Sequence, residues 1–163
     1  MELYKESDII LNMILRKAKI KDVKEIYRLV NHFAQEGEML PRSQSEIYEN
    51  MRDFFVVEEN GEVIGCCALH ILWDNLAEVK SLAVEEGYQG KGIGRMLVNA
   101  CLEEARELRI NRVFALTFKP AFFQKMGFRP IDKDDLPRKV WGECIKCPFF
   151  PDCKEEAVIM DLK

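Results

Sequence analysis

The sequence predicts a single α/β domain in which strands alternate with amphipathic helices. Three observations support this prediction. The chain has 163 residues, of which 48% are hydrophobic, and this suits one domain with its own core. Residues 78–108 read as a strand, a glycine-rich turn and a helix, because the apolar positions change from a strand pattern to three- and four-residue steps. Asn60-Gly61 stands between two apolar runs, which is a strong signal for a β-hairpin.

The other elements follow from hydrophobic periodicity, capping residues and turn residues. Residues 2–15 have the apolar spacing of a short helix, so we expect a helical extension over residues 1–14 that either packs on the domain or contributes to a homodimer. We expect the domain itself to occupy residues 15–163, with a capping box formed by Ser43 and Glu46. The helices expected in it cover 21–36, 43–51, 93–108 and 120–126. The expected strands cover 15–20, 54–59, 62–72, 78–84, 112–118, 128–131 and 158–162.

Composition and charge exclude several classes of partner. The formal net charge is −4, whereas binding to nucleic acid or to anionic membranes rests on positive patches. No apolar run approaches the roughly 20 residues of a membrane span. The N-terminus is polar and acidic, unlike a signal peptide, so we expect a cytoplasmic protein. Its six cysteines are then expected to be thiols or metal ligands rather than disulfides.

The glycine-rich turn at 89–95, Gln-Gly-Lys-Gly-Ile-Gly-Arg, has the composition of a phosphate-binding loop. Glycines let the backbone approach an anion, and the free N–H groups of the following helix favour its charge. Lys91 and Arg95 add positive charge. The turn is not a Walker A loop, because Gly92 follows Lys91 where Ser or Thr is needed, and its glycine spacing differs from the dinucleotide fingerprint. The remaining pattern is Q-x-x-G-x-G, and the alternative is a glycine-rich turn that only starts a helix.

This pattern resembles the acetyl-CoA pyrophosphate loop of the GCN5-related N-acetyltransferase (GNAT) family, Q/R-x-x-G-x-G/A. Residues 122–128, FFQKMGF, are similar to a second signature of the family. The resemblance implies the GNAT acyl-CoA N-acyltransferase fold, an α/β (α+β) architecture with a central mixed, mostly antiparallel sheet of six to seven strands flanked by helices. A closer resemblance, to the acetyltransferase domain of bacterial N-acetylglutamate synthases, rests on residues 15–26, 37–43, 63–69, 77–84 and 158–162.

The family resemblance implies acetyl-CoA as the cosubstrate and direct transfer of its acetyl group to an amine. The pantetheine is expected to pair with the strand at 82–84 as an added strand would, and the pyrophosphate is expected on the glycine-rich turn. The residues that the resemblance assigns to acetyl-CoA are Leu82, Ala83, Val84, Gln89, Gly90, Lys91, Gly92, Ile93, Gly94, Arg95 and Phe123.

Glu78, at the start of the same strand, is expected to act as the general base, because the attacking amine must be neutral. The alternative is a solvated carboxylate at a strand end. Many members of the family carry a tyrosine acid where this chain has Phe123, which cannot donate a proton. Thr117 is then the hydroxyl expected near the thiol or the pantetheine, unless it is only a structural strand residue.

A dicarboxylic amino-acid substrate requires cationic side chains. Arg42 is the best match to a substrate-binding arginine, and Lys119 is expected to assist it. Lys80 shares a strand face with Glu78 and either holds a substrate carboxylate or lies on the surface. The arginine and serine that relatives carry before the last strand are not reproduced here, and Lys154 is the candidate substitute.

Three cysteines, Cys144, Cys147 and Cys153, lie in a loop at 141–154. The C-x2-C spacing is typical of metal ligands, so a structural zinc is one interpretation, and reduced thiols or a redox pair are the others. The candidates for a fourth zinc ligand are Cys67, His70, His32 and Asp152. The cysteines expected in the core are Cys66, Cys67 and Cys101.

The expected function is therefore acetyl-CoA-dependent N-acetylation of an amino acid, with the α-amino group of L-glutamate as the leading substrate and arginine biosynthesis as the pathway. One alternative is a GNAT acetyltransferase for another small amine or a protein amine. A second is a non-catalytic acetyl-CoA-binding or metal-binding module. The expected partners are small molecules, without nucleic acid or membrane. With 163 residues, the chain is expected to lack the arginine-binding kinase-like domain of many such synthases.

Overall fold

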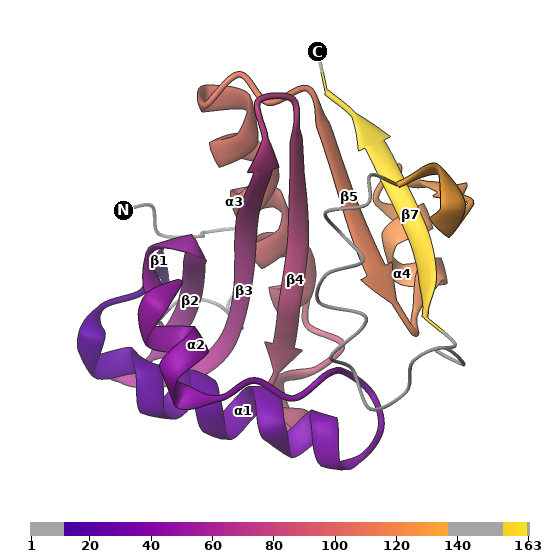
Figure 1. The fold of residues 1–163 in the computed structure, drawn as a ribbon. Coiled ribbons are helices and arrows are strands. Elements are labelled where there is room, and N and C mark those ends of the chain that lie inside the picture. Colours follow the sequence, from indigo (N-terminus) through magenta and orange to yellow (C-terminus); the bar gives the residue numbers. More distant parts are fainter. Residues whose placement is uncertain (1–11, 137–154, 163) are drawn as a thin grey trace.

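A computed structural model describes residues 12–136 and 155–162. These residues form a seven-stranded sheet with the strand order β1-β2-β3-β4-β5-β7-β6 (Figure 1). All neighbouring strands are antiparallel except β4 and β5, which run parallel. The predicted mixed, mostly antiparallel sheet is thereby confirmed. The strands are β1 (Met13–Lys17), β2 (Phe54–Glu59), β3 (Glu62–Trp73), β4 (Leu76–Val84), β5 (Arg112–Thr117), β6 (Arg129–Ile131) and β7 (Glu156–Asp161).

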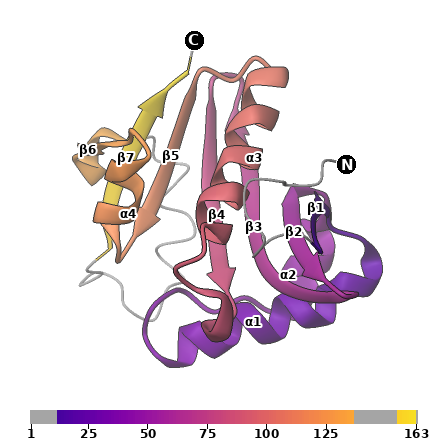
Figure 2. The same ribbon diagram turned by 180° about the vertical axis from the view of Figure 1, so that it is seen from behind.

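The helices form two layers, one on each face of the sheet (Figures 1 and 2). On one face lie α1, which packs on β3 and β4, and α2, which packs on α1. On the other face, α3 packs on β2, β3 and β4, and α4 packs on β6 and β7. The α-helices are α1 (Val23–Gln35), α2 (Gln44–Glu49), α3 (Ile93–Glu107) and α4 (Pro120–Lys125). The short 3-10 helices are η2 (Ile20–Asp22), η3 (Met51–Asp53), η4 (Glu86–Tyr88) and η5 (Lys133–Asp135). Within the described ranges, no helix is both long and apolar enough to cross a membrane.

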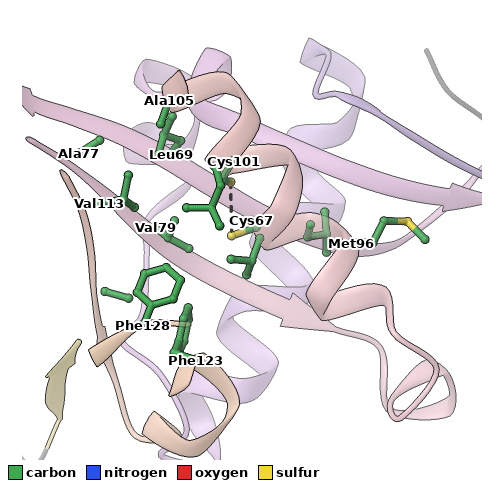
Figure 3. Close-up of a cluster of buried hydrophobic side chains, with 14 of the residues drawn as sticks. Cys67, Leu69, Ala77, Val79, Met96, Cys101, Ala105, Val113, Phe123 and Phe128 are labelled. Atoms are coloured by element: carbon green, nitrogen blue, oxygen red, sulfur yellow. Dashed lines mark hydrogen bonds between the residues drawn. The ribbon is translucent and has the colours of Figure 1, made fainter. Parts of the chain in front are cut away.

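Each helical layer buries its own hydrophobic cluster against the sheet. Beneath α3 and α4, Val79 of β4 packs in one cluster with Cys101 and Phe123 (Figure 3). On the opposite face, Ile26 and Leu29 of α1 are completely buried. Burial of each large aliphatic side chain contributes roughly 1.5–3 kcal/mol. The two clusters therefore pack both faces of β4, which carries much of the candidate site, against helices.

The N-terminal boundary differs from the prediction. The helix expected over residues 2–15 is wrong at its C-terminal end, because β1 begins at Met13; residues 1–11 lie outside the described residues. The side chains of Met13 and Leu15 are buried in the cluster beneath α3. The main chain here pairs with β2, and this pairing satisfies the backbone N–H and C=O groups of β1. A prediction from local apolar spacing cannot anticipate pairing with a strand that lies about forty residues further along the sequence.

The strand expected over 15–20 also ends earlier than predicted. It stops at Lys17, and Ile20 begins the 3-10 helix that leads into α1. Ile20 is 60% exposed, so its apolar side chain gave a misleading strand signal.

Two local signals are confirmed by the structure. Asn60 and Gly61 have φ angles of +52° and +85° and connect β2 to β3 in the predicted hairpin. The N-cap half of the predicted capping box is present, because the Ser43 hydroxyl accepts a hydrogen bond from Glu46 N at 3.1 Å and caps α2. The Glu46 carboxylate accepts its hydrogen bond from Ser43 Oγ, at 3.3 Å, and not from Ser43 N as a full capping box requires. Both signals are short-range, since turn and cap residues act on backbone groups within a few positions.

A buried ion-pair network joins β1 to the start of α1. The Arg16 guanidinium donates hydrogen bonds to Asp22 at 2.7 and 3.0 Å and to Glu58 at 2.7 Å. Asp22 is only 3% exposed and also accepts a hydrogen bond from Lys19 N. Burial opposes ionisation of Asp22, but the hydrogen bonds from Arg16 and Lys19 outweigh it and hold the pKa of Asp22 below its ordinary value.

Asp22→Asn is expected to lower the free energy of unfolding by about 2–4 kcal/mol at pH 7, because Arg16 keeps a buried charge and loses one of its two carboxylates. The folded-state pKa of Asp22 is lowered, so the stabilisation is present above the unfolded-state value of 3.8 and is lost as the pH falls through the folded-state value. The difference between the two proteins should therefore shrink in acid. Urea denaturation at pH 7 and pH 3 measures it, and an equal difference at both pH values would contradict the prediction.

Candidate active site

The parallel strands β4 and β5 separate and leave a cleft between them. Their paired residues are Ala77 with Val113 and Glu78 with Phe114, and beyond these pairs the strands diverge (Figure 1). The cleft has a volume of about 610 Å³. It is lined by β4 from Glu78 onward, the end of β5, the glycine-rich turn, α4 and the loop after α1. Among residues 12–136 and 155–162, no strand pairs with the β5-facing edge of β4 beyond Glu78. An extended ligand could bind to this edge as an added strand does.

A β-bulge at Ser81 decides which side chains of β4 face each side of the sheet. Ser81 has a φ of +56°, and Lys80 and Ala83 oppose β3 residues that are only two positions apart. The extra residue inverts the alternation of side chains along the strand. Before the bulge, Glu78 and Lys80 lie on the α1 face. After it, Leu82 packs against the cluster on the α3 face.

The glycine-rich turn lies where β4 passes into α3. Gly90 and Gly92 have φ angles of +78° and +87°, in the left-handed region that favours glycine. Gly92 is the N-cap of α3, whose first-turn N–H groups have no acceptor within the helix. Gln89 Nε2 donates to Val84 O at 3.0 Å and ties the turn to the end of β4. This arrangement offers backbone donors and a helix N-terminus to an anion.

Aromatic side chains of α4 form a wall beside the turn. Phe122 and Phe123 both line the cleft, and their rings stand perpendicular with centroids 5.1 Å apart. A Cβ atom at Gly94 would lie 3.3 Å from the Phe122 ring. Glycine at this position therefore lets the first turn of α3 approach α4 closely.

Ionisable side chains gather on the α1 face of the cleft. Glu78 is 7% exposed, and Lys80 lies two residues further along β4. Arg42 comes from the loop after α1, and its side chain is 14% exposed. Lys119, just beyond β5, forms an ion pair with Glu38 at 3.7 Å. A buried carboxylate among cations can accept a proton while the cations hold an anionic ligand.

Asn31 of α1 fixes the main chain at Arg42. Its Nδ2 donates to Arg42 O at 2.8 Å, and its Oδ1 accepts from Arg42 N at 3.2 Å. Nδ2 also donates to Tyr27 O at 2.9 Å within α1. The Arg42 guanidinium lies 3.6 Å from the Glu46 carboxylate on α2. Two helices thus determine where Arg42 enters the cleft.

Thr117, the last residue of β5, brings a hydroxyl to the cleft. Its Oγ1 accepts a hydrogen bond from Lys119 N at 2.8 Å, and the residue is 9% exposed. A hydroxyl that accepts one hydrogen bond still has its own proton to donate. Thr117 therefore gives this part of the cleft a neutral donor.

Most of the predicted site residues come together around this single cleft. Those that line it are Arg42, Glu78, Lys80, Leu82, Ala83, Val84, Gln89, Gly90, Gly92, Ile93, Gly94, Arg95, Thr117, Lys119 and Phe123. Lys91 is not among the lining residues, and its exposed ammonium group lies 5.3 Å from the centre of the Tyr88 ring. The candidate zinc ligands Cys144, Cys147 and Cys153, and also Lys154, lie outside the described residues.

Several lining residues were missed by the sequence prediction. Met39 and Leu40 contribute apolar surface from the loop after α1, and Glu155, at 8% exposure, contributes a carboxylate just before β7. The sequence contained only weak evidence for Glu155, which is a charged residue just before an apolar strand. It contained clearer evidence for the bulge, because Lys80 and Ser81 are adjacent polar residues that interrupt an otherwise alternating strand.

The described cysteines are core residues, as predicted. Cys67 and Cys101 lie beneath α3 with their Sγ atoms 3.8 Å apart (Figure 3). Burial raises the pKa of the Cys66 thiol to about 12 and raises that of Cys67 well above its ordinary value. Cys66 and Cys67 are therefore held in the protonated thiol form at neutral pH. Another candidate for the fourth zinc ligand, His70, is bound through Nδ1 to Asp53.

Comparisons with known proteins agree with this geometry. Residues 20–128 match the acetyltransferase (GNAT) family. The chain is 43% identical to an uncharacterised N-acetyltransferase of Chlorobaculum tepidum. The alignment spans 148 residues and covers 91% of this chain and 96% of that protein. It is 37% identical to an amino-acid acetyltransferase of Mycobacterium tuberculosis over 80% of this chain and 76% of that protein.

Solved structures show the same architecture. Rv2747 from Mycobacterium tuberculosis, in complex with CoA, superposes with a TM-score of 0.78 and 31% identity over 92% of this chain and 99% of that chain. The N-acetylglutamate synthase from Neisseria gonorrhoeae, complexed with coenzyme A and N-acetyl-glutamate, has a TM-score of 0.85 and 25% identity over 93% of this chain and 35% of that chain. The fold is thus that of a GNAT acetyltransferase. The chain belongs to the GNAT acetyltransferase family.

Proposed function

We propose that this acetyltransferase moves the acetyl group of acetyl-CoA to the α-amino group of an amino acid, with L-glutamate as the leading substrate. The observation that carries the proposal is the content of one cleft: a glycine-rich helix start, an open edge of β4, a buried carboxylate and several cations. The name of the Mycobacterium tuberculosis relative and the ligands of the Neisseria gonorrhoeae synthase support it. With glutamate as substrate, the reaction would be the first step of arginine biosynthesis.

Acetyl-CoA would bind with its charged part at α3 and its thioester toward Glu78. The pyrophosphate would accept hydrogen bonds from the N–H groups of the glycine-rich turn, where Gly92 starts the helix. Arg95, which lines the cleft, would add positive charge. The pantetheine amides would pair with the edge of β4 between Leu82 and Val84. This pose brings the thioester to the place where β4 and β5 begin to separate.

The chemistry requires a neutral amine, a stabilised oxyanion and a thiolate that can leave. Glu78 would take the proton of the substrate ammonium group, directly or through a water molecule. A backbone N–H on the open edge of β4 would stabilise the oxyanion of the tetrahedral intermediate. The Thr117 hydroxyl would donate a hydrogen bond to the leaving thiolate. Phe123 cannot do so, because its side chain has no polar atom.

The cations on the α1 face would select an acidic amino acid. The Arg42 guanidinium can hold a carboxylate through two parallel hydrogen bonds, and its main chain is fixed by Asn31. Lys80 would provide a second positive charge on the same face as Glu78. Lys119 is paired with Glu38 at the surface and would assist from the rim.

The direct test is CoA release by the purified chain from acetyl-CoA in the presence of a panel of amines. The panel contains glutamate, glutamine, aspartate, other free amino acids and a peptide with a free N-terminus, and mass spectrometry identifies the acetylated product. Turnover that is highest with glutamate supports the full proposal. Turnover with another amino acid keeps the reaction and replaces the substrate. Binding of acetyl-CoA without turnover on any amine would overturn the proposal.

Gly92→Ala is expected to raise KM for acetyl-CoA about 5- to 10-fold with a small change in kcat. A φ of +87° is unfavourable for alanine, so the N–H groups that would hold the pyrophosphate should shift. Gly61→Ala is the matched control, because Gly61 has a φ of +85° and, like Gly92, open space within 4 Å of where a Cβ would stand, but lies in the β2–β3 hairpin. Initial rates at varied acetyl-CoA concentrations give the KM of Gly92→Ala and of Gly61→Ala for comparison. A similar KM in both variants would contradict the assignment of the turn.

A further inference from the structure

A histidine–aspartate pair lies behind the proposed base, outside the residues that line the cleft. His70 of β3 and Asp53 of η3 are joined by a 2.7 Å hydrogen bond between Nδ1 and Oδ2. An ionised carboxylate only accepts hydrogen bonds, so Nδ1 carries the proton and donates it. The other ring nitrogen, Nε2, then has a lone pair when the imidazole is neutral. His70 is thus arranged to accept a proton on Nε2, while the Asp53 carboxylate fixes the orientation of the ring.

His70 stands directly beside Glu78 in the sheet. The β3–β4 register pairs these two residues. Paired residues on antiparallel strands point to the same face, with Cβ atoms about 4.5–5.5 Å apart. Glu78 is 7% exposed, whereas the side chains of His70 and Asp53 are 30% and 25% exposed. The His70 imidazole is therefore more exposed to solvent than the Glu78 carboxylate beside it.

The proposed reaction must release one proton to solvent in every turnover. A substrate ammonium group and acetyl-CoA react to give an N-acetyl amide, the CoA thiol and one proton: a C–N bond forms, the C–S bond breaks, and the sulfur leaves as a thiolate. The ammonium group loses one proton before attack, and the nitrogen loses a second one when the amide forms. One of these two protons ends on the thiolate, whose ordinary pKa is about 8.5. The other leaves the site, and a buried Glu78 that received it must be deprotonated before the next cycle.

We propose that His70 takes this proton from Glu78, through a bridging water, and passes it to solvent, with Asp53 holding the ring in the required tautomer. This role rests on the proposed function, because it presupposes Glu78 as the base. Among the described residues, Asp53 on η3 is hydrogen-bonded to His70, and Glu78 on β4 is its partner in the sheet register. His70 touches neither substrate nor thioester and acts through Glu78 as a positioning residue. Histidine suits this step because a neutral imidazole accepts a proton on one ring nitrogen and the resulting imidazolium can donate it onward.

The test is His70→Gln in the full chain, with kcat measured at low and high concentrations of imidazole buffer. We expect kcat to fall about 10-fold at low buffer concentration, with KM for acetyl-CoA within about twofold of wild type. Added imidazole should restore at least one third of the lost rate, because a small acceptor can replace the missing ring. His32→Gln is the matched control: it removes the other histidine of the chain, on exposed α1 surface, and should leave kcat and its buffer dependence unchanged.

The outcomes separate this inference from the proposed function. Wild-type turnover together with unchanged kcat in His70→Gln would overturn the role of His70 and leave the proposed function intact. A reduced kcat that no buffer restores would show a structural ion pair and would also overturn it. Absence of wild-type turnover on every amine would remove the proposed function itself. Asp53→Asn should lower kcat less than His70→Gln does, and imidazole should restore part of the lost rate. Binding of CoA, measured by thermal shift, shows that each variant is folded.

Discussion

Glu78→Gln is expected to lower kcat about 100- to 1,000-fold while KM for acetyl-CoA stays within about twofold of wild type. Glutamine keeps the size of the side chain but cannot take a proton from the substrate ammonium group. Because Glu78 is buried at 7% exposure, bulk water does not replace it easily. Without the base, the rate should depend on the small fraction of neutral amine, so kcat/KM of the variant should rise with pH more steeply than that of wild type. Initial rates between pH 6 and pH 9 measure both effects.

Glu62→Gln is the control for the loss of one negative charge. Glu62 lies at the exposed start of β3 and is not among the residues that line the cleft, so its variant should behave as wild type. If Glu78→Gln retained wild-type kcat at neutral pH, Glu78 would not be the proton acceptor. Deprotonation by solvent would then account for the reaction, and the proposed role of His70 would fall with it.

Arg42→Ala is expected to raise KM for glutamate about 30- to 100-fold, with little change in KM for acetyl-CoA. A hydrogen-bonded contact between charged groups in a partly buried site is worth roughly 1.5–3 kcal/mol, which corresponds to this change. Arg42→Lys should lose less, about 5- to 10-fold, because an ammonium group keeps the charge but not the paired geometry of a guanidinium. Steady-state kinetics with glutamate and with glutamine measure the effect.

The two substrates also show which carboxylate Arg42 holds. A collapse of the preference for glutamate over glutamine would place Arg42 at the side-chain carboxylate, whereas an equal rise of both KM values would place it at the α-carboxylate. Asn31→Ala should raise KM for glutamate in the same direction but less, because it loosens the main chain that carries Arg42. Unchanged KM values in Arg42→Ala would contradict the assignment of the substrate end of the cleft.

Short-range features of this protein could be predicted from its sequence, because neighbouring residues alone decide them. The positive φ angles at Asn60 and Gly61 follow from the residue types in a tight hairpin. The cap at Ser43 satisfies an N–H group only three residues away. The glycine-rich turn before α3 required Gly92 in the left-handed region, which the residue type permits at little cost. These signals, with hydrophobic periodicity, predicted the order of helices and strands, whereas the particular fold and the site residues followed from the resemblance to the GNAT family.

Features that depend on strand register and loop placement were accessible only through the tertiary structure. The start of β1 at Met13 depends on pairing with β2, and the bulge at Ser81 depends on how β4 aligns with β3. The hydrogen bond between His70 and Asp53 joins positions 17 residues apart, and its relation to Glu78 exists only because β3 and β4 pair in that register. The sequence by itself thus determined the turns, caps, helices and the glycine-rich loop, since these form from contiguous residues. Only the tertiary structure decided which side chains share the cleft with the base, because backbone pairing between distant segments sets that arrangement.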